Sequence, residues 1–184
     1  MGLRTITPPS TLLVSVAEQK TFMRVEHALD DAIIEQLILA ATSVAEQHTR
    51  RSLMQQSIRL TLDEFPEAIE LPRGPVSSVT EVRYTDGSGA DVVLSSSEYV
   101  LDNSAGDGAA WLLPAVGSAW PATQASANAL RVTYVAGVAS AADVPRAIKT
   151  WVMLRAAQLY DSRGSGDAPQ ENFDLLSPFV LYQM

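Results

Sequence analysis

The sequence predicts an α+β protein, in which a helical core of two N-terminal helices and one C-terminal helix carries an inserted antiparallel β domain. Two observations predict this class. Apolar residues recur with the period of a helix near both ends of the chain, and with the period of a strand in its middle. The middle contains several short strand patterns separated by turn residues, which indicates an antiparallel sheet or a small barrel.

The first predicted helix covers about residues 16–24. It follows a Pro-Pro pair and begins at Ser15, whose side chain can accept a hydrogen bond from the backbone N–H of Glu18. Glu18 can reach back to the Ser15 N–H, and this reciprocal pair is a capping box. The helix is short, so we expect it to need packing partners.

The second predicted helix, residues 31–48, has the clearest periodicity in the chain. Asp30 and Asp31 stand at its start, where negative charge suits the helix dipole. Arg50 and Arg51 close it, as expected at a C-terminus. The apolar stripe that should face the core includes Ile34, Leu37 and Ile38.

The pattern then changes to alternation of apolar and polar residues, as in half-buried strands. The predicted strands lie near residues 58–62, 80–84, 92–94, 99–101, 111–113 and 130–135. Turn residues separate them, at 86–89 and 103–108.

A third helix is predicted over residues 145–161, with Asp143 or Val144 as its cap and Pro145 in its first turn. Its apolar stripe includes Ile148, Trp151 and Val152. Each helix has an apolar stripe to bury, so the helices from both ends should pack together.

Four parts follow from these patterns. Residues 1–54 form the N-terminal helical part, 55–136 the inserted antiparallel β region, and 137–163 the C-terminal helix that completes the helical core. Residues 164–184 form a Gly/Ser/Pro-containing flexible linker and an apolar C-terminal tail.

Composition excludes several classes of protein. The 184-residue chain has no cysteine, which rules out disulfides and thiolate metal sites. Its formal net charge of −8 disfavours wrapping or reading DNA. No apolar run approaches the roughly 20 residues of a membrane span, and no signal peptide is visible. We therefore expect a soluble protein, made in the cytoplasm, with no membrane partner.

No motif for catalysis, cofactor binding or metal binding emerges, so we expect no enzyme, no cofactor and no metal. His27 and His48 lack partners at metal-site spacing. The nucleophile-elbow, dinucleotide-binding and P-loop patterns are all missing. Carboxylates gather at Asp63, Glu64, Glu67 and Glu70, which is typical of a solvated acidic loop.

Several segments, in order, resemble one known family, the head–tail connector (adaptor) proteins of tailed phages, which also occur in prophages and gene transfer agents. The resemblance runs from about Ile6 to Tyr160, and order and spacing together carry it. The segments are Ile6-Thr7-Pro8-Pro9, Ser15-Val16-Ala17-Glu18-Gln19-Lys20, Arg24-Val25, Thr49-Arg50-Arg51-Ser52-Leu53, Leu71-Pro72-Arg73-Gly74-Pro75-Val76, Val79-Thr80-Glu81-Val82-Arg83-Tyr84, Trp120-Pro121, Tyr134-Val135-Ala136-Gly137 and Val144-Pro145-Arg146-Ala147-Ile148-Lys149.

The resemblance implies a helical core with an inserted β domain and a structural role without catalysis. It implies identical subunits in a ring, a dodecamer, bound below the portal at the neck of the virion. The ring would extend the DNA channel, let DNA pass without sequence-specific binding, and receive a stopper or tail-terminator protein. Alternatives are another neck protein such as a tail terminator, a DNA-packaging accessory factor, or an enzyme.

The apolar tail has two interpretations: it docks on its own domain, or it docks on a neighbouring chain and hides a patch prone to aggregate. The second makes it a candidate portal-docking segment. Its residues are Phe173, Leu175, Leu176, Phe179, Val180, Leu181 and Tyr182. The candidate ring or core positions on the helices are Ile34, Leu37, Ile38, Ile148, Trp151 and Val152.

Overall fold

The chain divides into two compact units, each with its own core. The computed structural model describes residues 1–106, 108, 110–163 and 172–181. The β unit consists of Met1–Ser10 and Gln55–Gly137. The helical unit consists of Thr11–Met54 and the described part of Val138–Tyr182. The predicted α+β class, with helices and antiparallel sheets, is confirmed.

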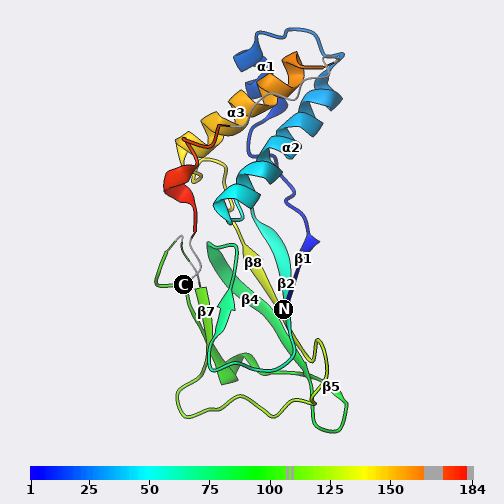
Figure 1. The fold of residues 1–184 in the computed structure, drawn as a ribbon, viewed down its shortest axis with the longest axis vertical. Helices are drawn as coiled ribbons and strands as arrows, with labels where there is room; N and C mark the ends of the chain where they lie inside the picture. The colour runs from blue at the N-terminus through cyan, green and yellow to red at the C-terminus, as the bar shows by residue number, and fades with distance from the viewer. Residues whose placement is uncertain (107, 109, 164–171, 182–184) are drawn as a thin grey trace. The chain divides into compact units, whose positions relative to one another are not determined.

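Three α-helices build the described helical unit: α1 (Val16–Met23), α2 (Asp31–Thr49) and α3 (Arg146–Asp161). Each lies within a residue or so of its predicted range. Helices α2 and α3 pack against each other, as Figure 1 shows. Helices α1 and α2 both end at an arginine in the left-handed conformation, with φ of 58° at Arg24 and 56° at Arg50.

The core of the helical unit lies between the apolar stripes of α2 and α3. The candidate core positions lie in it or against it, because their spacing puts them on one face of each helix. They are Ile34, Leu37, Ile38, Ile148, Trp151 and Val152. Most are almost fully buried, and Leu37 is half-buried.

Polar contacts fix α1 against the other two helices. Ser15 accepts a hydrogen bond from the Glu18 backbone N–H at 3.2 Å, which is one half of the predicted capping box. The Glu18 carboxylate lies 3.0 Å from Lys149 Nζ on α3. The buried Gln19 donates from Nε2 to the Met153 carbonyl at 3.0 Å. A buried side-chain hydrogen bond of this kind specifies the contact between the two helices.

The start of α2 is tied to the end of α3 through a carboxylate. The Tyr160 hydroxyl donates to Asp30 Oδ2 at 2.5 Å, and Arg163 Nη1 donates to the same oxygen at 3.2 Å. The Arg163 guanidinium also lies 3.6 Å from the centroid of the Tyr160 ring. These contacts hold the pKa of the Asp30 carboxyl below its ordinary value, the Tyr160 hydrogen bond being the largest cause.

The β unit contains a five-stranded antiparallel sheet in the order β1-β2-β8-β4-β5. Its strands are β1 (Gly2–Thr7), β2 (Gln56–Leu62), β8 (Leu130–Ala136), β4 (Val76–Thr85) and β5 (Asp91–Val93). Strand β8 is central and alternates buried and half-buried residues along its whole length.

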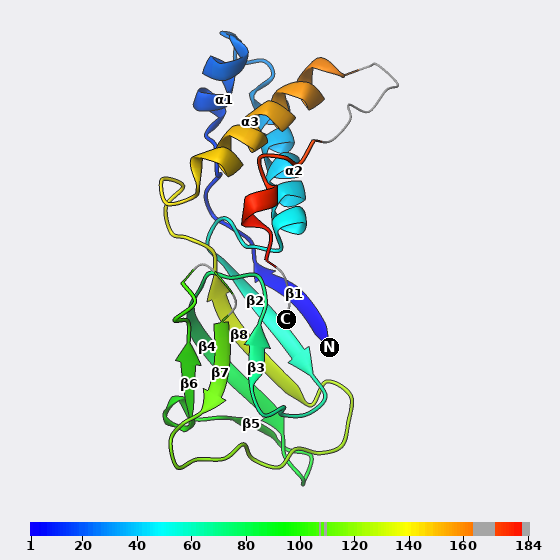
Figure 2. The ribbon, with the colours of Figure 1, turned by 60° about the vertical axis from the view of Figure 1, so that its left-hand side comes forward.

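A second sheet of three antiparallel strands has the order β3-β7-β6. Its strands are β3 (Ile69–Leu71), β7 (Ala110–Pro114) and β6 (Tyr99–Asp102). Figure 2 shows it in front of the five-stranded sheet. One apolar core contains the inward residues of both sheets, so the β unit is a two-layer sandwich. Between the layers, the buried Tyr134 donates from its hydroxyl to the Pro72 carbonyl at 2.7 Å, and burial raises its pKa.

Two strands were not predictable from alternation. Strand β1 places Met1–Ser10 in the β unit, whereas the sequence predicts a helical part from residue 1 to 54. All six β1 residues are exposed, so the strand carries no alternating apolar signal, and pairing with β2 alone defines it. Strand β3 has only three residues and includes Glu70, which the sequence predicts to lie in an acidic loop.

The predicted cap of the third helix is wrong by one or two residues. Pro145 is the N-cap of α3, instead of Asp143 or Val144, and it makes no side-chain capping bond.

Within the described part of the chain, no helix is long and apolar enough to cross a bilayer.

Because the core of the sandwich is closely packed, shortening a buried side chain of β2 should strongly lower the free energy of unfolding. Leu60 is 1% exposed, and Leu60→Ala should lower the free energy of unfolding by about 2–5 kcal/mol, because it leaves a cavity between the sheets. Thr61→Ala, on the opposite face of the same strand, should change it by less than about 0.5 kcal/mol. Urea unfolding followed by circular dichroism measures both, and equal effects would contradict the sandwich.

The Asp30 contacts predict a pH-dependent difference in stability. A folded carboxyl with a lowered pKa binds fewer protons than its unfolded form, so it stabilises the fold above about pH 4 and loses that effect as the pH falls. Asp30→Asn should therefore be less stable than the unchanged chain at pH 7, and the gap should close towards pH 2. Thermal unfolding across pH measures it, with the exposed Asp143→Asn as control; a constant gap would contradict the prediction.

Candidate functional site

The described C-terminal segment, residues 172–181, packs on the helical unit through apolar side chains. Leu176 is fully buried in the helical core. The Phe173 ring stacks on His48 of α2, with centroids 4.0 Å apart, and on Trp151 of α3, at 5.6 Å. Phe179 also packs against this core. The segment therefore completes the core that α2 and α3 begin.

Backbone groups of the same segment form hydrogen bonds with α2, with α3 and with Arg51, which follows α2. Trp151 Nε1 donates to the Asn172 carbonyl at 2.5 Å, and Arg51 Nε donates to the Phe179 carbonyl at 2.6 Å. The Leu181 backbone N–H donates to the Thr49 carbonyl at 3.0 Å, at the C-terminal end of α2. The last carbonyl of α2 thus gains a partner from the tail.

In this structure the described part of the tail docks on the helices of its own chain, which is the first of the two interpretations of the apolar tail. Among the candidate docking residues, Leu175 is 41% exposed, while Val180 and Leu181 are half-buried. Tyr182 lies outside the described residues. Docking on a portal remains a prediction, and in this arrangement Leu175, Val180 and Leu181 offer the accessible apolar surface.

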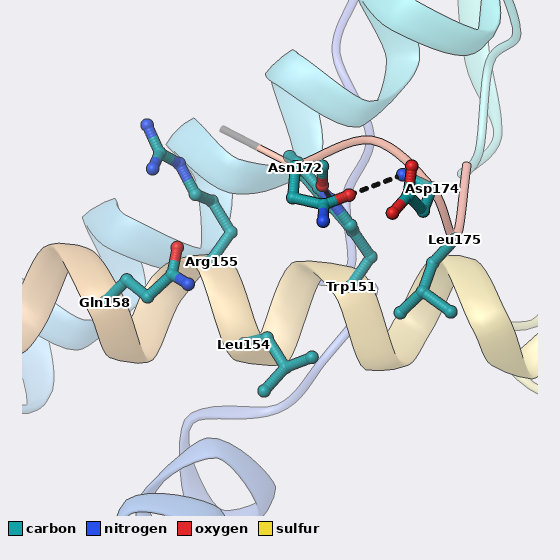
Figure 3. Close-up of a pocket in the computed structure, with 7 residues that line it drawn as sticks. All are labelled: Trp151, Leu154, Arg155, Gln158, Asn172, Asp174 and Leu175. Atoms are coloured by element: carbon teal, nitrogen blue, oxygen red, sulfur yellow. Dashed lines mark hydrogen bonds between the residues drawn. The ribbon is translucent and has the colours of Figure 1, made fainter. Parts of the chain in front are cut away.

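A pocket of about 360 Å³ lies between α3 and this segment. Figure 3 shows Leu175 at one end of it and Gln158 at the other, with Leu154 and Arg155 between them along α3. Its other lining residues are Trp151, Asn172 and Asp174. An apolar end beside polar groups suits an apolar side chain from a partner better than it suits a reacting substrate.

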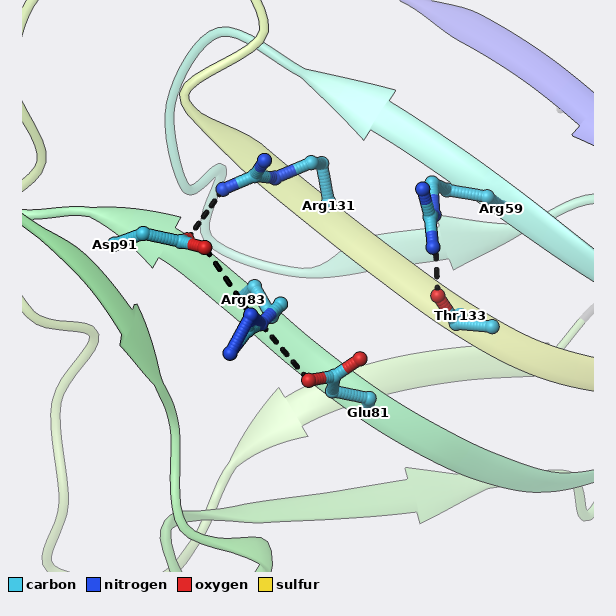
Figure 4. Close-up of polar contacts among 6 residues, drawn as sticks. All are labelled: Arg59, Glu81, Arg83, Asp91, Arg131 and Thr133. Atoms are coloured by element: carbon cyan, nitrogen blue, oxygen red, sulfur yellow. Dashed lines mark hydrogen bonds and ion pairs between the residues drawn. The ribbon is translucent and has the colours of Figure 1, made fainter.

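Charged side chains gather on the outer face of the five-stranded sheet (Figure 4). Asp91 on β5 forms ion pairs with Arg83 on β4, at 3.1 Å, and with Arg131 on β8. Arg83 Nε also lies 2.8 Å from Glu81. These side chains are about one-third to one-half exposed, so each pair adds at most about 1 kcal/mol to stability.

The cross-strand register brings two more arginines to this face. Arg59 pairs with Arg4 on β1 and with Thr133 on β8, whose hydroxyl accepts a hydrogen bond from Arg59 Nε at 3.4 Å. The sequence interpretation missed this basic face, which is defined by Arg4, Arg59, Arg83 and Arg131. The signal is present, because each arginine except Arg4 alternates with a buried apolar neighbour in its strand.

Residues singled out for possible chemistry have structural roles. Asp63 accepts a hydrogen bond from the Asn128 backbone at 2.8 Å, and His48 stacks on Phe173. The loop after β2 is held by Phe65, whose ring stacks on Trp120 at 4.8 Å. Across the described residues, no three His, Asp or Glu side chains converge as metal ligands.

Comparison with known proteins identifies relatives of both the sequence and the fold. Residues 14–89 match the family model of the phage gp6-like head-tail connector protein. No curated protein matches the chain.

Three solved structures share the fold over 100% of this chain and 97% of theirs. The "Neck of empty GTA particle computed with C6 symmetry" has a TM-score of 0.82 at 24% identity. The "Virion of native gene transfer agent (GTA) particle" has 0.80 at 25%, and the "Neck of native GTA particle computed with C12 symmetry" has 0.79 at 23%. The predicted resemblance to head–tail connector proteins is therefore confirmed by the family model over residues 14–89, and chains of neck structures share the fold over the whole chain.

Proposed function

We propose that this chain is a structural subunit of the neck of a tailed phage or gene transfer agent, a connector that forms a ring below the portal. The observation that carries the proposal is the similarity of fold to chains in neck structures of GTA particles. This similarity extends over both units and covers 100% of the chain. The gp6-like match over residues 14–89 supports the same role independently, because it rests on sequence.

A ring of identical copies fits the symmetry of the similar assemblies, which were computed with C6 and C12 symmetry. Such a ring closes when one surface of each copy binds a different surface of the next. Twelve copies at −8 each would carry a formal charge of −96. An assembly of that sign would not grip DNA, so it suits a channel that DNA passes through.

A non-catalytic role agrees with the described polar clusters. The Asp30, Asp91 and Asp63 carboxylates are each held by ion pairs or hydrogen bonds within the fold. Among its described lining residues, the pocket beside α3 mixes apolar and polar groups and has no nucleophile beside a base. The ring would instead act by contact, with the portal on one side and a stopper or tail-terminator protein on the other.

The tail supports a specific portal contact. Leu175 and Leu154 of α3 both line the pocket, and each is 41% exposed. These two leucines offer apolar surface to a partner, and Leu175 stands on a fixed base because Leu176 and Phe173 anchor its segment in the helical core. We therefore assign the portal contact to Leu154 and Leu175, and not to the anchoring residues Leu176 and Phe173.

The test of the proposal is the mass of the purified chain, alone and mixed with the portal ring from the same genome, by native mass spectrometry. A multi-subunit ring, alone or on the portal, is expected. A monomer that ignores the portal at micromolar concentrations would overturn the proposal.

The portal contact predicts different effects for two neighbouring leucines. Leu175→Asp should weaken portal binding at least about tenfold, since it puts a charge on an apolar contact, and should leave stability within about 0.5 kcal/mol. Leu176→Ala should instead lower the free energy of unfolding by about 2–5 kcal/mol. Portal pull-down and urea unfolding measure the two effects. Unchanged portal binding by Leu175→Asp would remove this surface from the portal contact.

A further inference from the structure

The two outer faces of the β sandwich differ in charge. The outer face of the five-stranded sheet is the basic face, with four arginines: Arg4, Arg59, Arg83 and Arg131. The chain has 13 basic residues against 21 acidic ones, so four arginines on one sheet face are a marked concentration. Glu81 and Asp91 are the carboxylates paired there, which leaves a formal charge of +2 on this set of residues.

The unneutralised positive charge of the basic face lies on β1 and β2. Asp91 and Glu81 neutralise Arg83 and Arg131. Within the described part of the chain, Arg4 and Arg59 lie in no ion pair; Arg4 is exposed and Arg59 is half-buried. They face each other across the β1–β2 pair. Two guanidinium groups side by side without a carboxylate repel each other and favour an acidic partner.

The opposite face, on the three-stranded sheet, has the complementary charge. The register places Glu70, Trp111 and Asp102 in one row across β3, β7 and β6. Val100 and Leu113 form the next outward pair, and Val100 is 51% exposed. The three strands contain no lysine or arginine. We name this set, Glu70, Val100, Asp102, Trp111 and Leu113, the acidic face.

These residues point away from the sandwich core, as the alternation requires. Ile69, Leu71 and Leu112, their neighbours along the strands, are fully buried between the sheets. On the other sheet, Ile58 and Leu60 flank Arg59 and are buried in the same way. The basic and acidic faces therefore lie on opposite sides of one rigid unit.

We infer that the basic face of one copy binds the acidic face of the next, and that this contact is a subunit interface of the ring. The inference rests on the proposed function and names its partner, a second copy of this chain. A closed ring needs two different, complementary surfaces on each copy, and the sandwich has faces of +2 and −2 on opposite sides. The half-buried Trp111 supplies the large apolar side chain that such interfaces favour at their centre.

Charge reversal on each face provides the test. One variant combines Arg4→Glu with Arg59→Glu, and the other combines Glu70→Lys with Asp102→Lys. Each alone should reduce ring formation on the portal at least about tenfold, because like charges then meet at every interface. An equimolar mixture should restore the ring, since alternating copies again place opposite charges at every contact. Native mass spectrometry should then show the two variants in equal number.

The control is Glu35→Lys, an exposed charge reversal on α2 that should leave the ring intact. Circular dichroism confirms that each variant is folded. If the unchanged chain forms no ring, the proposed function fails. If it does form a ring, and either folded reversal variant forms it equally well, or the mixture stays unassembled, the inference is overturned. Retained assembly with loss of salt-sensitive DNA binding in the arginine variant would also overturn it, and would assign the basic face to phosphates.

Discussion

The pairing of β2 with β8 is the interaction on which both units depend. These strands are the second and the last of the β unit in sequence, yet they are neighbours in the five-stranded sheet, with Gln56 opposite Ala136. The two ends of the insertion are therefore adjacent. In the helical unit, Met54 correspondingly forms a bridge with Val138, so α2 and α3 can pack as though the insertion were absent. Loss of this pairing would free the two ends of the insertion, so that bringing α2 and α3 together would cost more loop-closure entropy.

Much of the fold could be predicted, because its main elements have strong periodic signals. The α2 stripe through Ile34 and Ile38 and the alternation along β8 each specify one buried face, and both predictions agree with the structure. Strand β1 could not be found, since its exposed residues owe their conformation to pairing with a distant strand. Tertiary hydrogen bonds of that kind leave no local pattern in the sequence.

The candidate site was less accessible to sequence reasoning than the fold. An apolar cluster such as Phe173 and Leu176 indicates burial, but it does not say against which surface. The structure places both residues on their own helices and leaves Leu175 exposed. The net charge was similarly incomplete as a guide, because −8 is a sum over the whole chain and does not show that the two outer faces of the sandwich have opposite signs. What each face can bind depends on how the charges are distributed over the two faces, and that distribution becomes known only with the strand register.

A neck subunit of this kind should surround a channel below the portal. Cryo-electron microscopy of the chain mixed with the portal of the same genome tests for such an assembly. We expect a closed ring on one end of the portal, with the helical and β units resolvable in each copy. Bare portals beside free chain, at concentrations well above those that saturate a specific interface, would contradict it.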